Sequence, residues 1–167
     1  MNNKLEIRNI KAFNLFIGEL DCSDFSYYQK PIINYLYNKT NYSFGEIISN
    51  QGGWQQNKYE LIYEKEFQEY FNYFKNKIQV LLSKMLNIRS FEIVQAWGNI
   101  NGKYNCNITH SHPGSDLAAC FYIKCPKNCG NLVINNPNLV YNTKLFKYYK
   151  KEFNPGYDIT VKPKDGK

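Results

Sequence analysis

The sequence contains no long hydrophobic run and no recognisable targeting segment. Its N-terminus, MNNKLEIRNIKAFNLF, has neither a central apolar stretch nor a small-residue cleavage site, which argues against a secretory signal peptide. No apolar stretch approaches the roughly 20 residues that a membrane-spanning helix requires. We therefore expect a cytoplasmic protein that has no membrane partner.

Arginine and histidine are both scarce. The only arginines are Arg8 and Arg89, so the chain has no Arg-rich run of the kind that nucleic-acid-binding segments carry. The net charge is +7, but the lysines that produce it are scattered along the chain. We interpret the positive charge as a solvated surface and do not expect a nucleic-acid partner.

Cysteine is present, but not in the pattern of a disulfide framework or a paired zinc knuckle. The five cysteines are odd in number, and their spacings include no CxxC pair. In a reducing compartment such residues are more simply free thiols. The cysteines are Cys22, Cys106, Cys120, Cys125 and Cys129.

The first part of the chain, residues 1–90, has mainly helical patterning. A short helix is expected at 26–40, with Pro31 near its start, and a long helix at 59–87. Apolar residues of the long helix recur every three or four positions, which places them on one core-facing side. These residues are Phe67, Phe71, Phe74, Ile78, Leu81 and Met85.

From residue 91 the hydrophobic period changes from helical to alternating. Short β-prone segments are separated by Gly, Asn and Pro, and they lie at 91–97, 104–110, 117–124 and 131–135. Several short strands at this spacing are typical of a sandwich or jelly roll. Because 43% of the residues are hydrophobic and no linker is evident, we expect one α+β domain over 1–167, with N-terminal helices packed on the sheet.

Both histidines of the chain lie two positions apart, at His110 and His112. On a strand, residues at i and i+2 point to the same side, so the two imidazoles can face one point and hold a divalent metal. Asp116, just past the Pro113-Gly114 turn, could add a carboxylate. Two other interpretations stay open: polar residues at a strand end, or a small zinc-binding protein that uses the His/Cys cluster.

Two sequence stretches together resemble a known family. SNQGGWQ at 49–55, followed by AWGNINGKYNCNITHSHPGSDLAACFYIKCPKNCGNLVINNP at 96–137, is similar to the 2-oxoglutarate/iron(II) oxygenase family of marine bacteria and phages, in an H-x-H variant. That family shows a GGW loop, a helix, W-x-N, a Gly turn, H-x-H-P, a Ser-Gly-x-x-Tyr-Tyr strand and a G-x-L-x-F-x-x-P strand in this order. In place of the Ser-Gly this chain has Ala118-Ala119 or Ala119-Cys120.

The resemblance implies a double-stranded β-helix, a cupin-like jelly roll, whose mouth holds Fe(II). It implies His110 as the first metal ligand and His112 at the usual carboxylate position. Asn99, Tyr104 and Tyr122 lie where side chains that contact 2-oxoglutarate are expected. The implied activity is a hydroxylase-type dioxygenase, an oxidoreductase that acts on an unknown substrate.

The sequence departs from the family pattern after the segment VKPKDGK at 161–167, because no histidine follows His112 and no arginine follows Arg89. The family has a distal His and a 2-oxoglutarate-binding Arg there. We therefore expect a C-terminally truncated copy whose jelly roll is incomplete and which could be inactive as given. A non-catalytic jelly-roll binding module is the alternative. Trp54 and Trp97 are expected to be packing residues.

Overall fold

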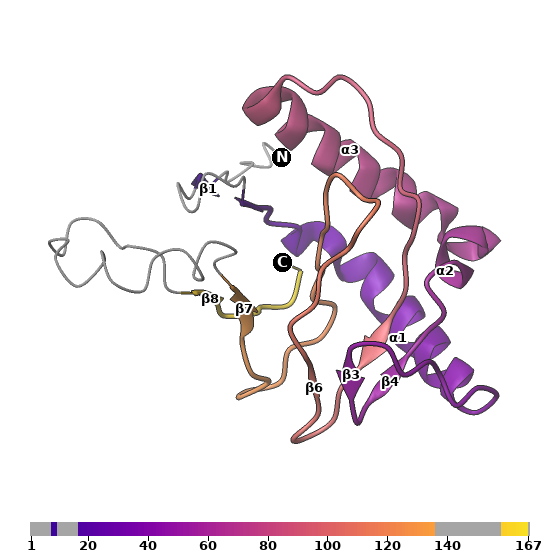
Figure 1. The fold of residues 1–167 in the computed structure, drawn as a ribbon. Coiled ribbons are helices and arrows are strands. Elements are labelled where there is room, and N and C mark those ends of the chain that lie inside the picture. Colours follow the sequence, from indigo (N-terminus) through magenta and orange to yellow (C-terminus); the bar gives the residue numbers. More distant parts are fainter. Residues whose placement is uncertain (1–7, 10–16, 136–157, 167) are drawn as a thin grey trace, which may run out of the picture.

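The computed structural model describes residues 8–9, 17–135 and 158–166, and it combines helices with small antiparallel sheets (Figure 1). The helices are α1 (Ser26–Thr40), α2 (Glu60–Tyr63) and α3 (Gln68–Leu86), with 3-10 turns η1 (Ser23–Phe25) and η2 (Lys65–Phe67). The strands are β1 (Arg8–Asn9), β2 (Gly18–Glu19), β3 (Asn50–Gln51), β4 (Trp54–Gln55), β5 (Asn99–Ile100), β6 (Cys106–Asn107), β7 (Leu132–Ile134) and β8 (Ile159–Val161).

Helix α1 has the bounds that the sequence pattern predicts. Ile32 and Leu36, one turn apart, are buried against the rest of the molecule, whereas Tyr37 is exposed. Pro31 is the sixth residue of the helix, beyond its first four N–H groups, so its missing N–H removes one backbone hydrogen bond of the helix. The helix is therefore a single amphipathic element that presents one apolar side to the core.

The long helix predicted at 59–87 is interrupted, and this is a correction. Glu64 has extended backbone angles between α2 and η2, and α3 begins only at Gln68. The Glu64 carboxylate accepts a hydrogen bond from Tyr35 Oη at 2.7 Å and pairs with Lys39 Nζ at 3.2 Å, both on α1. These contacts fix Glu64 against α1, and burial followed by the bond to Glu64 raises the pKa of Tyr35 to about 12.

An aromatic core joins α1, α3 and the later part of the chain. The apolar side of α3 is buried as predicted, with Phe67, Phe74 and Leu81 under 10% exposed. Phe121 reaches this core, with its ring centroid 4.6 Å from that of Phe25 and 4.3 Å from that of Phe74. Figure 1 shows the extended segments that include β3 to β6 lying over α1 and α3.

The strands are short and form four separate two-stranded antiparallel ladders, β1–β2, β3–β6, β4–β5 and β7–β8. Within the described residues no closed double-stranded β-helix is present. The first part of the chain contributes β3 and β4 to the same ladders as β5 and β6, so the expected division at residue 90 is not a division between layers. That this is one domain stays a prediction.

Two predicted strands are wrong. Segments 91–97 and 117–124 contain no strand, because within the described part of the chain neither is paired along its length. The alternating side chains of 117–124 separate instead: Leu117 is 43% exposed, whereas Phe121 turns into the aromatic core. The alternating pattern thus identified Phe121 as a core residue. It did not identify a neighbouring strand with which segment 117–124 could pair.

Residues 158–166 contact both the N-terminal part of the chain, at Cys22, and the later part, at Tyr122 and β7. Strand β8 pairs with β7 over three residues, and Gly166 then bridges two distant segments. Its carbonyl accepts a hydrogen bond from Cys22 N at 2.8 Å, and its N–H donates to Tyr122 O at 2.9 Å. No described helix is long and apolar enough to cross a bilayer.

Candidate metal and cosubstrate site

The two histidine rings lie next to each other, but not as members of the predicted strand, since β6 ends at Asn107. The ring centroids of His110 and His112 are 4.9 Å apart, and the rings are inclined at 80°. The Nδ1 of His110 is 2.7 Å from Ile108 O. Because a carbonyl only accepts hydrogen bonds, Nδ1 carries the proton there, which leaves Nε2 with a free lone pair suited to a metal.

His112 is the more protected member of the pair. It is half-buried, and its ring centroid lies 5.7 Å from that of Trp97. Burial, and then the neighbouring His110, lower the pKa of His112, which favours the neutral imidazole that binds metals. Trp97, expected only as a packing residue, therefore also contacts the candidate site.

The chain that leads into the histidines is held by β3. Ile108 N donates to Ser49 O at 2.7 Å, and the Asn107 amide donates to the Ser49 hydroxyl at 3.0 Å. Along this segment the polar side chain is more sheltered than its apolar neighbours. Cys106 and Ile108 are exposed, whereas Asn107 points inward to Ser49.

The third predicted ligand is not assembled with the pair. Asp116 is exposed beyond the Pro113-Gly114 turn. Among the described residues, no three His, Cys, Asp or Glu side chains are grouped so that they could hold one metal ion. The structure thus places two neighbouring imidazoles but no third side chain beside them, and the same finding gives no support to a zinc site built from the His/Cys cluster.

The three predicted cosubstrate residues have different surroundings. Asn99 lies in β5 opposite Gln55 of β4 and is exposed. Tyr104 is 88% exposed on the turn before β6. Tyr122 is half-buried, and burial followed by the neighbouring Cys120 raises its pKa. Of the three, Asn99 is nearest in sequence to Trp97, the residue that contacts His112.

The GGW loop serves as an anchor, as the sequence suggests. Gly52 and Gly53 have φ angles of +66° and +65°, a left-handed conformation that favours glycine. The reversal sends β3 and β4 to different partners, β6 and β5. Trp54 packs on the helical core, and its Nε1 donates to Ser43 O at 3.0 Å.

Sequence reasoning missed Gln55. Its side chain is 3% exposed, and Oε1 is buried without a hydrogen-bond partner among the described residues. Trp54 and its partner Ile100 face the helical core, so Gln55 and its partner Asn99 face the opposite side of the ladder. In the sequence, only the alternation of side chains after the GGW turn points to Gln55. The side of the ladder that Gln55 faces becomes clear only from the pairing of β4 with β5.

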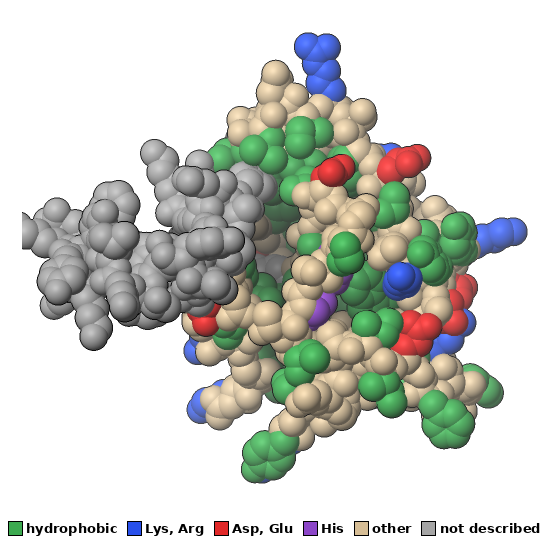
Figure 2. Space-filling view, in the orientation of Figure 1, with side chains coloured by type: hydrophobic (Ala, Val, Ile, Leu, Met, Phe, Trp, Pro, Cys, Tyr) green, Lys and Arg blue, Asp and Glu red, His purple; other side chains and the backbone are tan. Residues whose placement is uncertain are grey.

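The space-filling view shows the histidine surface near the middle of one face (Figure 2). Hydrophobic and uncharged atoms border it closely, and most of the charged side chains visible on this face lie farther out. This arrangement suits a neutral pair of metal-binding imidazoles.

A comparison with protein families gives a match to the part of the chain that contains the candidate site. Residues 95–167 match the family model described as "Putative 2OG-Fe(II) oxygenase". Comparisons with curated proteins and with solved structures gave no match. All six predicted site residues fall inside the matched segment, which spans less than half of the chain. The C-terminal part, including both histidines, is thus similar to a 2-oxoglutarate/Fe(II) oxygenase family.

Proposed function

We propose that the protein is an Fe(II)- and 2-oxoglutarate-dependent dioxygenase of H-x-H type in which His110 and His112 bind the iron. The observation that carries this proposal is the pair of adjacent imidazoles inside the family-matched segment. A metal suits the pair because imidazole is a common iron ligand and His110 has its Nε2 free. Asp116 is the proposed third ligand.

The side chains around the pair have separate proposed roles. When bound, iron and 2-oxoglutarate supply the activation of O₂ through oxidative decarboxylation of the cosubstrate. The Ile108 carbonyl fixes the tautomer and orientation of His110, as outer ligands of metal-bound histidines do. Trp97 shields one side of His112 from water.

Cosubstrate binding is proposed for three polar side chains. The Asn99 amide, in β5 and two residues after Trp97, can donate a hydrogen bond to a carboxylate of 2-oxoglutarate. Tyr122 stays a neutral hydroxyl donor because burial raises its pKa. Tyr104, exposed on its turn, would have to fold over the bound molecule. The substrate is a small molecule or a side chain whose identity the proposal leaves open.

A cytoplasmic location is part of this proposal. All five cysteines are free thiols, as expected in a reducing compartment. Iron(II) is also more easily kept reduced there.

The test is anaerobic titration with Fe(II) in the presence of 2-oxoglutarate, followed by measurement of succinate after O₂ is added. His110→Ala and His112→Ala are each expected to weaken Fe(II) binding by more than the ~10–100-fold that outer-shell changes cost. Ser111→Ala, which changes the exposed residue between the histidines, is the matched control and should bind like the wild type.

The outcomes separate the proposal from its alternatives. Fe(II) binding that the histidine variants do not reduce would reject the iron site. Binding of Fe(II) without any succinate would reject the enzymatic proposal and favour a non-catalytic binding module. Asp116→Ala should weaken Fe(II) binding if Asp116 is the third ligand, and unchanged affinity would exclude it.

A further inference from the structure

Three cysteines that the proposed iron site does not use lie close together around Tyr122. Cys129 lies close enough to Cys125 to raise the pKa of its thiol, and Cys120 lies close enough to Tyr122 for the two side chains to affect each other's pKa. Among the described residues they do not form a three-ligand metal group. A neighbouring pair of thiols without a metal has another chemistry open to it, which is disulfide formation.

The backbone between Cys125 and Cys129 forms a tight turn. Cys129 N donates to Pro126 O at 3.1 Å, and Asn128 has a left-handed φ of 67°. Pro126 fixes its own φ and limits the conformations of the loop. The chain therefore reverses within the sequence Cys-Pro-Lys-Asn-Cys and returns the second thiol to the first.

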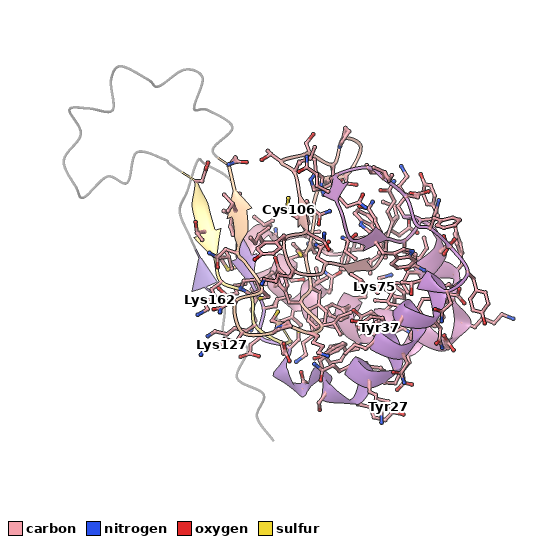
Figure 3. The ribbon with its side chains drawn as sticks, turned by 90° about the horizontal axis from the view of Figure 1, so that it is seen from below. Tyr27, Tyr37, Lys75, Cys106, Lys127 and Lys162 are labelled. Atoms are coloured by element: carbon pink, nitrogen blue, oxygen red, sulfur yellow. The ribbon has the colours of Figure 1, made fainter. Side chains whose placement is uncertain are left out.

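The turn is also held from outside. Cys125 N donates to the Asp165 carboxylate at 2.5 Å. Lys162 lies three residues before Asp165 in the sequence. Figure 3 shows Lys127, inside the turn, close to Lys162. With the bond from Gly166 N to Tyr122 O, these contacts anchor one end of the turn while Cys129 stays exposed.

The two thiols differ in accessibility. Cys129 is exposed and Cys125 is half-buried. Burial, and then the neighbouring Cys129, raise the pKa of Cys125 to about 12, so Cys125 remains a protonated thiol at neutral pH. A dissolved oxidant would thus meet Cys129 first, and Cys125 would be the second thiol to react.

We propose that Cys125 and Cys129 form a redox modification site at which hydrogen peroxide converts the two thiols into a disulfide. The Cys129 thiolate attacks one peroxide oxygen, the O–O bond breaks, and the released hydroxide takes up a proton to become water. Cys125 then gives up its proton and attacks the sulfur of the Cys129 sulfenic acid. The S–O bond breaks, a second water leaves and the S–S bond forms, so two thiols are oxidised while one peroxide is reduced.

The sequence provides a direct readout for this disulfide. Trypsin cleaves after Lys124 and Lys127, which separates Cys125 from Cys129. Metal-free wild-type protein is kept with a chelator, treated with hydrogen peroxide, blocked with iodoacetamide and digested. Mass spectrometry is expected to find the peptide Cys125–Lys127 linked to the peptide Asn128–Lys144, whatever the outcome of the iron experiments.

Three variants assign the roles of the sulfurs. Cys120→Ser, the matched control from the same cluster, should still give the linked peptides. Cys125→Ser should stop the reaction at a Cys129 sulfenic acid, which dimedone traps. Cys129→Ser should abolish the linked peptides. Cys106, exposed in β6 and away from the turn in Figure 3, is the reference thiol without a partner cysteine.

The contribution of the fold is measured by repeating the reaction in urea. Because the turn holds the two sulfurs together, linked peptides should form at least about tenfold faster in folded than in unfolded protein. Equal rates in the two states would overturn the proposal. So would the absence of the linked peptides from wild-type protein, or a disulfide in which Cys120 takes the place of either cysteine.

Discussion

Phe121 packs edge to face on Phe74, with ring centroids 4.3 Å apart and ring planes at 76°. Phe74 belongs to α3, whereas Phe121 belongs to the segment that matches the oxygenase family. The contact thus joins the helical core to the part of the chain that carries the candidate site. Edge-to-face pairs contribute about 0.5–1.5 kcal/mol beyond the area they bury.

Phe121→Ala should therefore weaken the attachment of the family-matched segment to the helices. We expect a loss of about 2–3 kcal/mol in the free energy of unfolding, somewhat less than for a fully buried Phe, because Phe121 is half-buried. Leu117→Ala, in the same predicted strand but 43% exposed, is the control and should cost under about 1 kcal/mol. Urea denaturation measures both; equal losses would contradict this account of the core.

The predictions that succeeded depended on residues near each other in sequence. Helix α1 follows from the i, i+4 spacing of Ile32 and Leu36. The imidazoles are adjacent, but the strand at 104–110 from which this was predicted is paired only at Cys106–Asn107. The break at Glu64 could not be predicted in this way, because it depends on Tyr35, 29 residues away on another helix. Helix periodicity carries no information about such a partner.

The strands failed for a related reason. Segments 91–97 and 117–124 have the alternation of strands, but a strand also needs a neighbouring backbone, and the described residues give them none along their length. The buried face of Gln55 likewise depends on its pairing with Asn99, 44 residues later. The contact between Trp97 and His112 was missed because it joins two segments that are not paired in register.

Gly98 is a position where an added methyl group should be costly. A Cβ built on Gly98 would lie 2.3 Å from Leu36 Cδ2, so Gly98→Ala forces β5 away from α1. We expect a loss of about 1–3 kcal/mol in the free energy of unfolding, which is typical of overpacking. Gly102→Ala is the control, because its Cβ would meet only the Asn105 side-chain oxygen at 3.0 Å.

The same contact can be tested by combining substitutions. In the double variant with Leu36→Ala, the Gly98→Ala change should cost much less than it does alone, because the clashing methyl groups are gone. Additive costs in chemical denaturation would show that the two residues do not interact as described.

Gln55 and Gln56 should respond in opposite ways to replacement by leucine. Gln56 is fully bonded: its Oε1 accepts from Gly98 N at 3.2 Å, and its Nε2 donates to Tyr35 Oη at 3.0 Å. Gln56→Leu leaves Gly98 N without its acceptor and removes the bond to Tyr35 Oη, which keeps its own bond to Glu64, and it should cost about 2–3 kcal/mol. Gln55→Leu removes an acceptor that is already unpaired, so it should be neutral or stabilise by up to about 1 kcal/mol.

Thermal unfolding of both variants without metal is the measurement. If Gln55→Leu destabilises the protein as much as Gln56→Leu does, Oε1 has a partner in solution, such as a buried water, and the description of Gln55 as unpaired is wrong.

Asp24 should make the stability of the protein sensitive to acid. Partial burial opposes ionisation of Asp24, but the hydrogen bond from Tyr73 and the nearby Lys77 ammonium outweigh it and lower the pKa of Asp24. A carboxyl whose pKa is lower in the folded state stabilises the protein above its unfolded pKa of about 4, and this contribution is lost as the pH falls through the folded pKa.

Asp24→Asn should therefore destabilise the protein at about pH 7 by ~0.5–1 kcal/mol and have less effect at about pH 3. Glu92→Gln, at an exposed carboxylate, controls for the change in net charge. Urea midpoints at the two pH values give the comparison. A difference between wild type and Asp24→Asn that stays constant with pH would show that ionisation of Asp24 is not the cause.

The bridge at Gly166 has a consequence for the order in which the protein is made. Its hydrogen bonds to Cys22 and Tyr122, together with the β7–β8 ladder, require residues from the beginning, the middle and the end of the described chain. During synthesis, helices α1 and α3 can meet as soon as they leave the ribosome, whereas these bonds must wait for residue 166. Until residues 158–166 have emerged, the nascent chain therefore lacks the bonds that tie Cys22 and Tyr122 together, and a chaperone would have most effect on yield in this interval.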